Sequence, residues 1–421
     1  MKYFNTKNNV IKCWCDNPEE GAIEQAKNLA DLPFVKHPVC LMPDTHQGYG
    51  MPIGGVVATS GVVIPNAVGV DIGCGMAAVK TDLTELSIDR LKKIMTLIRK
   101  KIPVGFSHHK NPQSEELLLK KYDTFSNMGY VIDDLTICFE EYKKSLKSLG
   151  TLGGGNHFIE IQRGDDGYIW FMVHSGSRNL GLKVAKYYNE VAKEINNKYY
   201  SSVDNKLDLA FLPLDSEEAR DYLKEMGFCL NYAQTNRDLM VDRIKEAFTE
   251  VPCSNCNGKG GFEGKKCPKC EGGLTGENCP VNFEETINIH HNYARMENHF
   301  GKNLMIHRKG ATSAKEGEIG IIPGSQGTSS YIVKGKGNKE SLKSCSHGAG
   351  RKMSRTKAIK HLSLKHQQRL LDEQNILHAI RGEKDLDEAP GAYKDIDVVM
   401  EEQQDLVEVL VKLKPLAVIK G

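Results

Sequence analysis

Short runs rich in Val and Ile, each interrupted by Gly or Pro, constrain the fold of this chain more than any other feature. The stretch GGVVATSGVVIPNAVGVDIGCG (residues 54–75) predicts strands joined by tight connections. Two other stretches, ELSIDRLKKIMTLIRK (85–100) and SRTKAIKHLSLKHQQRLLDEQNILHAI (354–380), have the apolar period of helices. The sequence therefore predicts a mixed fold of the α+β class. We find no repeat and no long linker, so we expect one large domain over residues 1–421, interrupted by a small insertion at 251–280.

The insertion contains the segment PCSNCNGKGGFEGKKCPKCEGG, which lacks the apolar residues needed for a core of its own. Two C-x-x-C pairs, Cys253 with Cys256 and Cys267 with Cys270, are each followed by Gly nearby, which permits a tight knuckle. This pattern predicts a structural Zn²⁺ with four thiolate ligands, whose binding would stabilise the segment. The alternative is a set of free or redox-active thiols. The repeat C-x-x-C-x-G-x-G resembles half of the zinc module of DnaJ-type chaperones.

The start of the chain, MKYFNTKNNVIKCWCDNPEE, has no apolar signal region, and no stretch approaches the roughly 20 apolar residues of a membrane span. We therefore expect a cytoplasmic protein without a membrane partner. Its twelve cysteines then indicate buried thiols, metal ligands or catalytic groups in place of disulfides. The formal net charge is only +2, so binding of a polyanion would require basic residues gathered locally.

Residues suited to metal binding follow several glycine-rich turns. Asp71 and Cys74 lie three residues apart in AVGVDIGCGM, and the run GTLGGGNHFIEIQ carries His157 directly after a glycine turn. His174 ends an apolar strand, and INIHHNYARM supplies a His pair. Carboxylate, thiolate and imidazole together suit Mn²⁺, Zn²⁺, Co²⁺ or Fe²⁺. Taken singly, Cys74 is equally compatible with a buried structural thiol, and each His is equally compatible with a hydrogen-bonded core histidine.

A third block combines a Gly/Ser turn, PGSQGTSS, with the segment SHGAGR. The turn offers backbone N–H groups and hydroxyls of the kind that hold phosphates, and it is flanked in sequence by Arg308, Lys309, Lys334 and Lys336. In SHGAGR, small residues leave His347 uncrowded, and Arg351 can meet a phosphate bidentately. From the residues alone, His347 is a nucleophile toward phosphorus, a general base or a metal ligand.

The order of ten motifs along the chain resembles that of the RtcB-type RNA ligases. These motifs are MPDTHQGYGMPIGG, VGVDIGCGM, LGGGNHFIEI, VHSGSR, HHNYA, HRKGAT, PGSQGTSSY, SHGAGR, AYKDIDVV and the terminal PLAVIKG. The resemblance covers nearly the whole chain outside the Cys-rich insertion. It implies an enzyme that uses GTP and two Mn²⁺ ions to join RNA 3′-phosphate or 2′,3′-cyclic phosphate ends to 5′-hydroxyl ends. A covalent histidine–GMP intermediate is implied as well.

Carried over by position, the resemblance makes His347 the guanylylated nucleophile. It implies that Asp71, Cys74, His157, His174 and His291 bind two Mn²⁺ ions, with Cys74 bridging them. His291 is preferred to His290 because it directly precedes an Asn. The residues implied to bind the nucleotide are Asn156, His157, Phe158, Ile159, Glu160, His291, Asn292, Pro323, Gly324, Ser325, Gln326, Ser330, His347, Gly348, Ala349, Gly350, Arg351, Tyr393 and Lys420.

Two other functions remain as alternatives: a two-metal phosphatase or nuclease, and a non-catalytic RNA-binding paralogue. SHGAGR and the terminal Lys420 disfavour the first, and the presence of the nucleophile and all metal ligands disfavours the second. For the insertion, Lys259, Lys265, Lys266 and Lys269, with Lys245 before them, predict contacts with RNA or a partner, against a purely structural zinc loop. The sequence leaves open the physiological RNA, the oligomeric state, the metal loaded in the cell and the need for an accessory activator protein.

Overall fold

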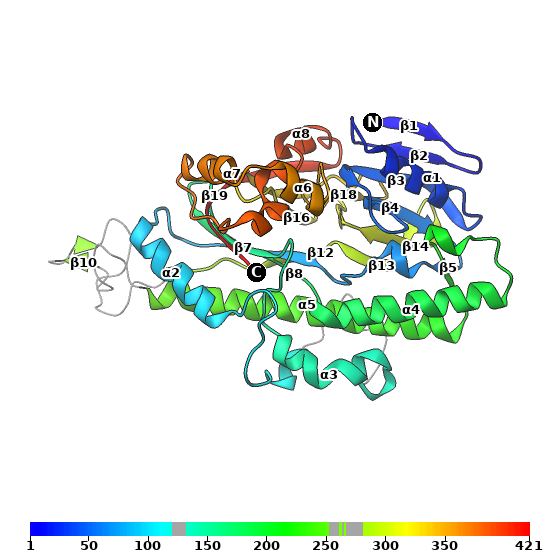
Figure 1. Cartoon of the computed structure of the whole chain (residues 1–421), viewed down its shortest axis with the longest axis horizontal. Helices are drawn as coiled ribbons and strands as arrows, with labels where there is room; N and C mark the ends of the chain where they lie inside the picture. Colours follow the sequence, from blue (N-terminus) through cyan, green and yellow to red (C-terminus); the bar gives the residue numbers. More distant parts are fainter. Residues whose placement is uncertain (120–131, 252–260, 263–264, 267–280) are drawn as a thin grey trace.

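The structure is a computed structural model that describes residues 1–119, 132–251, 261–262, 265–266 and 281–421. It contains two large sheets with helices on their outer faces (Figure 1). The mixed α and β class predicted from the sequence is confirmed. Most of the Cys-rich insertion, with all four of its predicted zinc ligands, lies outside the described residues.

The first large sheet has six strands and is built mostly from the N-terminal part of the chain. Its strands, in spatial order, are β1 (Lys2–Asn5), β2 (Val10–Cys13), β3 (Val35–His46), β4 (Ile53–Thr59), β14 (Lys302–Lys309) and β13 (Asn292–His299). Only β2 and β3 run parallel, and the other neighbours are antiparallel. Helix α1 (Glu20–Ala30) packs on this sheet through its buried apolar face.

The second large sheet has seven strands and carries several of the polar residues singled out in the sequence. Its strands, in spatial order, are β12 (Ile287–His290), β6 (Gly75–Lys80), β8 (Ile169–Ser175), β7 (Phe158–Gly164), β19 (Val407–Lys420), β17 (Ser330–Gly335) and β16 (Ile319–Ile322). All neighbouring strands in it are antiparallel. Strand β8 is buried along its whole length, because helices or strands cover both of its faces.

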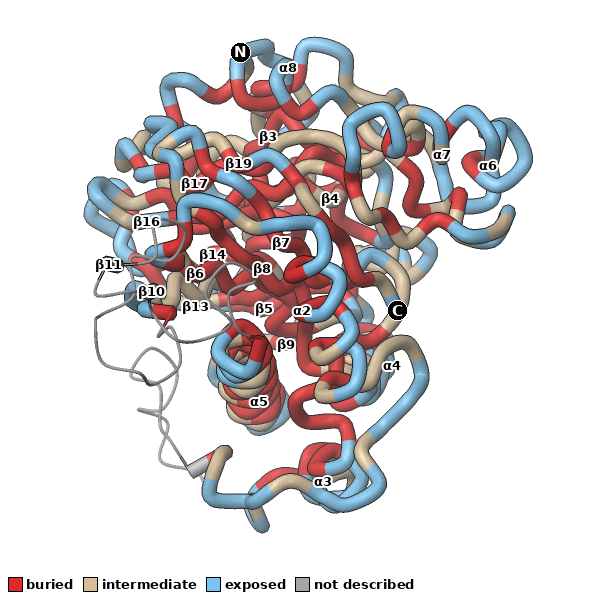
Figure 2. The backbone as a smooth tube through the Cα atoms, turned by 90° about the vertical axis from the view of Figure 1, so that its left-hand side faces the viewer, coloured by how far each residue is buried: buried red, intermediate tan, exposed pale blue. Residues whose placement is uncertain are grey.

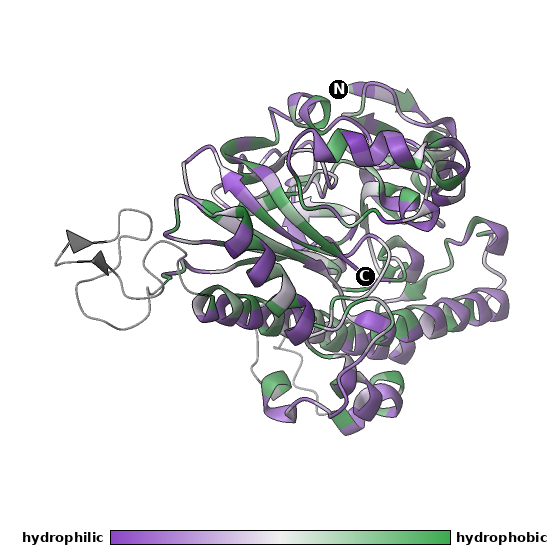
Figure 3. Ribbon diagram, turned by 60° about the vertical axis from the view of Figure 1, so that its left-hand side comes forward, coloured by the Kyte–Doolittle hydropathy of each residue, from purple (hydrophilic) through white to green (hydrophobic). Residues whose placement is uncertain are grey.

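Helices cover one face of the second sheet, and a further helix lies outside them. The longest, α5 (Glu217–Glu250), is capped by Ser216 and packs against β6 and β8. Helix α4 (Arg178–Lys198) lies beside it, and α3 (Ile137–Ser148) covers the far side of this pair (Figure 1). The hydropathy colouring shows apolar residues turned toward the sheet and polar ones outward (Figure 3). Burial of these apolar faces provides most of the driving force for folding here.

The helix predicted in residues 85–100 is confirmed as α2 (Ile88–Lys101). Ser87 caps it by accepting a hydrogen bond from the Arg90 N–H at 3.3 Å. Its buried residues Leu91, Ile94, Met95 and Ile98 recur at helical spacing and pack against β19 and α5.

The second predicted helical stretch, residues 354–380, divides into two short helices and an extended end. Helices α6 (Arg355–His361) and α7 (Leu364–Asp372) each begin at a serine cap, Ser354 and Ser363. The cap at Ser363 starts a second helix, although the apolar period runs through this position without a break. After α7 the chain extends and Leu377 pairs with Ala417 of β19, so tertiary pairing overrides helical periodicity there.

The remaining elements are short. They are β5 (Val62–Val63) with β9 (Leu212–Pro213), β15 (Ala311–Ser313) with β18 (Ser344–Ser346), β10 (Gly261–Phe262) with β11 (Lys265–Lys266), helix α8 (Ile396–Glu401), and the 3-10 turns η1 (Pro65–Ala67), η2 (Glu115–Leu119), η4 (Ile132–Asp134), η5 (Asn205–Leu207), η6 (Glu383–Glu388) and η7 (Pro390–Ala392). Among the described helices, none combines the length and the apolar character needed to cross a bilayer.

A buried ion pair fastens the edge strand β13 to β14. The Arg308 guanidinium is fully buried and donates to Glu297 Oε1 at 2.6 Å and to Oε2 at 3.1 Å. It also donates to Ser344 Oγ at 2.9 Å, which links the first sheet to β18. Burial by itself would raise the pKa of Glu297, but Arg308 outweighs it and holds that pKa well below its ordinary value.

Replacing Glu297 by Gln should lower the free energy of unfolding by about 3–5 kcal/mol at pH 7, because the Arg308 charge would stay buried without a counter-charge. A carboxyl with a depressed pKa stabilises the fold above its unfolded pKa and loses this effect as the pH falls. The difference in free energy of unfolding between the native chain and E297Q, measured by denaturant unfolding, should therefore decrease below about pH 4.

The matched control is Glu373→Gln, which removes an exposed carboxylate 3.6 Å from Arg369 on α7. Such a pair contributes at most about 0.5 kcal/mol. Equal losses in the two variants would contradict the role given to Glu297.

Candidate active site

The turn that carries Asp71 and Cys74 is held where the two large sheets meet. The Cys74 N–H donates to Asp71 O at 3.1 Å, and the His291 N–H donates to Cys74 O at 2.9 Å. Gly75 pairs with His290 across β6 and β12, and a Cβ there would lie 2.0 Å from Ile289 O. Only glycine permits this approach, which brings Cys74 beside the first residue after β12.

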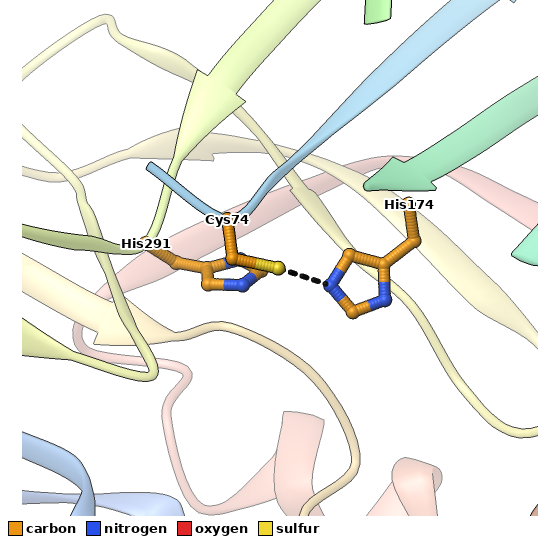
Figure 4. A group of neighbouring side chains, drawn as sticks. All are labelled: Cys74, His174 and His291. Atoms are coloured by element: carbon orange, nitrogen blue, oxygen red, sulfur yellow. Dashed lines mark hydrogen bonds between the residues drawn. The ribbon is translucent and has the colours of Figure 1, made fainter. Parts of the chain in front are cut away.

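Five side chains converge at this junction and share one sulfur atom. Cys74 Sγ lies 3.3 Å from His174 Nε2 and 3.4 Å from His157 Nε2. The potential ligand atoms form two groups, Cys74 with His174 and His291, and Asp71 with Cys74 and His157, each within 4.8 Å. Figure 4 shows the Cys74 sulfur directed toward the His174 ring, with His291 beside it. The residues form a candidate centre for two metal ions that share a thiolate.

Backbone carbonyls fix the orientation of two of these imidazoles. His157 Nδ1 lies 3.1 Å from Leu152 O, and His174 Nδ1 lies 3.1 Å from Asn156 O. Each Nδ1 can therefore carry the proton and leave Nε2, the atom facing the sulfur, as a ligand. His291 Nδ1 is buried and has no hydrogen-bond partner within the described part of the chain. A buried polar atom in that state is costly unless something binds it, so the donor set fits a metal ion.

Electrostatics keep two of the histidines and Asp71 in the forms that bind metal. Burial, with the neighbouring histidines, holds the pKa values of His174 and His291 well below their ordinary value, so both rings are neutral. Burial alone would raise the pKa of Asp71, but the hydrogen bond with His157 at 3.1 Å brings it below its usual range. Burial and the Asp71 charge raise the pKa of Cys74, which a bound cation would reverse.

The structure separates the two adjacent histidines. His291 faces Cys74 and His174, whereas His290 Nδ1 lies 3.1 Å from Arg237 Nη2 and 3.1 Å from Gly73 O. Consecutive residues near a strand point to opposite faces, so only one of the pair can join the metal group. This placement agrees with the choice of His291 from the sequence.

His347 lies beside the metal group and is oriented by a carboxylate. Its Nδ1 lies 2.6 Å from Asp44 Oδ2, which also accepts the backbone N–H groups of His347 and Gly348 at 3.0 and 3.2 Å. Burial opposes ionisation of Asp44, but His347 brings its pKa below the ordinary value. The His347 and His291 rings are 4.8 Å apart between centroids. Asp44 thus holds the Nδ1–H form and leaves Nε2 with a free lone pair.

A cavity of about 260 Å³ opens between the metal group and His347. It gathers most of the residues that the sequence assigned to nucleotide binding. Those lining it are Asn156, Phe158, Glu160, His291, Asn292, Pro323, Gly324, Ser325, Gln326, His347, Gly348, Ala349, Gly350, Arg351, Tyr393 and Lys420. Gly350 has φ +72°, and a Cβ there would lie 2.1 Å from Asp44 O, so glycine is required beside the partner of His347.

Two carboxylates face this cavity in opposite states. Burial raises the pKa of Glu160 to about 8, although Gln162 and Lys420 oppose the rise. Burial would also raise the pKa of Glu388, but Lys420 at 3.1 Å and other cations keep it below its ordinary value. Glu388 also accepts the Tyr393 hydroxyl and pairs with Arg351 and Arg355, both at 3.3 Å. The cavity therefore holds one ionised and one readily protonated carboxyl group, both suited to reading donors on a base.

Three assigned residues lie behind the cavity wall. Ile159 is buried in the core with Ala417 and Ile419, and Ser330 Oγ accepts from the Gly324 N–H at 3.1 Å. His157 contributes through Asp71 and Cys74.

Two of the cations that flank the Gly/Ser turn in the sequence have partners away from the cavity. Arg308 pairs with Glu297, and Lys309 donates to the backbone carbonyls of Tyr49 and Asn66, with burial lowering its pKa to about 7. Both side chains are buried, and neither lines the cavity.

Several residues of the site escaped the sequence analysis. Asp44 and His46 come from MPDTHQGYGMPIGG, where the Asp reads as an ordinary turn residue. Glu388 ends an acidic 3-10 turn, and Arg355 begins α6. The signal available for Asp44 was its place within MPDTHQGYGMPIGG, one of the ten motifs that carry the resemblance. Glu388 had no signal, because one acid among several in GEKDLDEAP is indistinguishable from a solvated surface.

Comparison with known proteins agrees with this geometry. The chain matches the family described as tRNA-splicing ligase RtcB over residues 25–260 and 270–421. It is 37% identical to RNA-splicing ligase RtcB1 of an Escherichia coli strain and 36% identical to RNA-splicing ligase RtcB of Escherichia coli K12. Each alignment covers 99% of both chains. The tRNA-splicing ligase RtcB of Nanoarchaeum equitans is 34% identical over 96% of this chain and 92% of its own.

Replacing Cys74 by Ser should lower Mn²⁺ affinity by more than about 100-fold, because this sulfur belongs to both ligand groups and even outer partners of a metal change affinity about 10- to 100-fold. Counting free Mn²⁺ by electron paramagnetic resonance during titration measures the change. The control is Cys138→Ser, a buried thiol of α3 whose Sγ faces Glu225 O. Unchanged Mn²⁺ binding in C74S would refute the shared-thiolate centre.

Proposed function

This chain belongs to the RtcB family and is an RNA ligase, and we propose that it joins RNA 3′-phosphate or 2′,3′-cyclic phosphate ends to 5′-hydroxyl ends through a covalent histidine–GMP intermediate. One observation carries the mechanism. His347 is held by Asp44 through Nδ1, its Nε2 is left free, and its ring lies beside the metal ligand His291. A structural histidine would not need both arrangements in one cavity, and a covalent GMP adduct distinguishes a nucleophile from a general base.

The first step uses this geometry. His347 Nε2 attacks the α-phosphorus of GTP, a nitrogen–phosphorus bond forms, and the bond to pyrophosphate breaks. The ring becomes positively charged as it attacks, and the ionised Asp44 stabilises that charge through Nδ1–H. Two Mn²⁺ ions bound by Asp71, Cys74, His157, His174 and His291 would neutralise phosphate charge.

Two transfers complete the reaction. GMP passes from His347 to the RNA 3′-phosphate, which frees the imidazole. The RNA 5′-hydroxyl then attacks that activated phosphate, a phosphodiester bond forms, and GMP leaves. A 2′,3′-cyclic phosphate is first hydrolysed to the 3′-phosphate at the same site. Because the nucleophile, the metal group and the cavity are adjacent, all steps can use one buried environment.

We assign the guanine to the part of the cavity near the chain end. Tyr393 offers a ring for stacking, and Lys420 and the carboxyls of Glu160 and Glu388 offer polar contacts to the base edge. Ser325 and the backbone of Gly324 extend this wall. A two-metal phosphatase would explain the metal ligands but gives no reason for a base-sized cavity beside His347, and a non-catalytic paralogue gives no reason for the Asp44–His347 pair.

We propose a structural Zn²⁺ on Cys253, Cys256, Cys267 and Cys270, which lie outside the described residues. We further propose a cytoplasmic location and, for the insertion, contacts with RNA or a partner. An accessory activator protein is a separate proposed partner of the enzyme.

Replacing His347 by Ala should abolish formation of a GMP adduct while leaving the fold and Mn²⁺ content nearly unchanged, because the ring contacts Asp44 and the His291 ring but is not itself in the metal group. Incubation with GTP labelled at the α-phosphate and Mn²⁺, followed by denaturing electrophoresis and an acid-lability test, detects the adduct. His361→Ala removes an exposed histidine of α6 and should label normally. Equal labelling of H347A and native chain would refute the assignment.

Replacing Asp44 by Asn should slow adduct formation by about 10²–10⁴-fold, because the amide no longer stabilises the charged ring or fixes its tautomer. Single-turnover labelling measures the rate, and circular dichroism checks the fold. The control is Asp395→Asn, at the cap of α8, where Asn serves as well as Asp. A D44N rate within about threefold of the native rate would mean that the carboxylate only packs against the ring.

A further inference from the structure

The segment that follows the nucleophile is strongly basic although the whole chain is nearly neutral. No Asp or Glu occurs between Glu340 and Asp372, whereas seven Lys or Arg lie in residues 351–369. We call six of them the basic tract: Lys352, Arg355, Lys357, Lys360, Lys365 and Arg369. The tract is the local gathering of charge that a net charge of +2 would require for binding a polyanion.

The tract is exposed, and most of it has no counter-charge. All six residues are exposed on or next to α6 and α7. Arg355 pairs with Glu388 at 3.3 Å, and Arg369 lies 3.6 Å from Glu373. Within the part of the chain that the structure describes, Lys352, Lys357, Lys360 and Lys365 form no ion pair within 4.0 Å.

The acidic groups nearest to the tract are engaged elsewhere. Helix α6 packs on η6, whose Asp385 accepts the backbone N–H groups of Arg381 and Gly382 at 2.7 and 2.8 Å. Glu388 is shared among the cations of the cavity, and Asp372 faces His378 at 3.2 Å. Glu383 and Asp387 also lie on η6, but in the part of the chain that the structure describes neither forms an ion pair within 4.0 Å with a lysine of α6 or α7.

The tract is continuous with the cavity. Arg351 and Arg355 line the cavity beside His347, and Arg355 also lies close to Gly155 in the glycine turn before His157. From there α6 and α7 extend over the outside of the molecule, on the side of the second sheet opposite α3, α4 and α5 (Figures 1 and 2). A chain whose end occupies the cavity can therefore leave it across these two helices.

The positive charge continues beyond α7. A groove of about 460 Å³ between α2 and the end of α7 is lined by Lys92, Arg99 and Arg381, and also by Asp372, which faces His378. The cations outnumber the single carboxylate there, so an anion in this groove would be stabilised.

We propose that the basic tract binds the phosphate backbone of the RNA strand whose end lies in the cavity. This inference rests on the proposed ligase function. Of the large apolar residues of α6 and α7, only Ile359 is notably exposed, so the surface is unsuited to an apolar protein interface. Flexible lysines spaced along two short helices suit phosphates irrespective of base sequence, and they would contact nucleotides away from the reacting end.

The test compares two triple variants with the same change in charge. K357Q/K360Q/K365Q removes three unpaired lysines of the tract, and K143Q/K183Q/K186Q removes three exposed lysines of α3 and α4 on the opposite side of the second sheet. Binding of a labelled single-stranded RNA of about 20 nucleotides with a 3′-phosphate is titrated with Mn²⁺ but without GTP, so no turnover occurs. The titration is repeated over a range of salt concentrations.

The logarithm of the RNA affinity falls linearly with the logarithm of the salt concentration, and each lost phosphate contact should make this slope shallower by about 0.7. At 0.1 M salt this corresponds to about a fivefold loss of affinity. The tract variant should therefore bind about 100-fold more weakly with a slope smaller by about 2, and the control variant should stay within about threefold of the native chain. A dinucleotide with a 3′-phosphate is confined to the cavity and should bind all three proteins equally.

Equal RNA affinity of the two variants, or a matching loss for the dinucleotide, would overturn the proposal. The adduct assay with labelled GTP and Mn²⁺ requires no RNA, so it tests the ligase mechanism independently of the basic tract. All three proteins should form the His347 adduct equally. Absence of the adduct from the native chain would refute the ligase mechanism, while the RNA titration would still decide whether the tract binds a polyanion.

Discussion

Asn292 makes the junction on which the whole site depends. Its backbone carbonyl accepts the Gly73 N–H at 2.9 Å, its side-chain amide donates to Asp71 O at 3.0 Å, and its Oδ1 accepts the Gly310 N–H at 2.7 Å. One residue thus ties the metal-binding turn, the crossing from β12 to β13 and the turn after β14. Because Gly310 lies against the His347 ring, this junction also sets the distance between metal group and nucleophile. A small shift here would move every reacting group.

His347 has its own support on the first sheet. Lys394 donates to the backbone carbonyls of Pro43 and Thr45, at 3.0 and 2.6 Å, on either side of Asp44. Its charge also favours the ionised form of the Asp44 carboxyl, against a burial that opposes it. The first sheet therefore supplies the group that orients His347, and the second sheet supplies the metal ligands. Catalysis at a junction of this kind needs both sheets to be rigid, and the buried Glu297–Arg308 pair contributes to that rigidity.

Glycine turns and the periodicity of strands and helices are local signals, so the sequence was sufficient for the mixed fold class and for α2. The residue types that it singled out as metal ligands come together in the structure. The residues alone left three roles open for His347, because the carboxylate that orients it is Asp44, some 300 positions away in the chain. Charge in a sequence does not show whether a side chain is buried, so the burial of Arg308 and Lys309 could not be foreseen. The helical period of 354–380 corresponds to α6 and α7, but the break between them depends on the Ser363 cap and the extended end on pairing with β19.

Charge is distributed differently inside and outside the cavity, and this difference orders the events of binding. Within the cavity, Arg351, Arg355 and Lys420 share the single carboxylate of Glu388, so part of their charge is neutralised and an anion must compete with Glu388 for them. The lysines of the basic tract carry no such commitment, and their field extends about 10 Å into solvent at moderate salt. A polyanion is therefore attracted first to α6 and α7. Its terminal phosphate then reaches Arg355, which belongs to both regions, and exchanges with Glu388 on the way toward His347. One segment of the chain, from residue 347 to residue 369, thus has two separate roles. Its outer part attracts the polyanion, and its inner part contacts the terminal phosphate in the buried cavity.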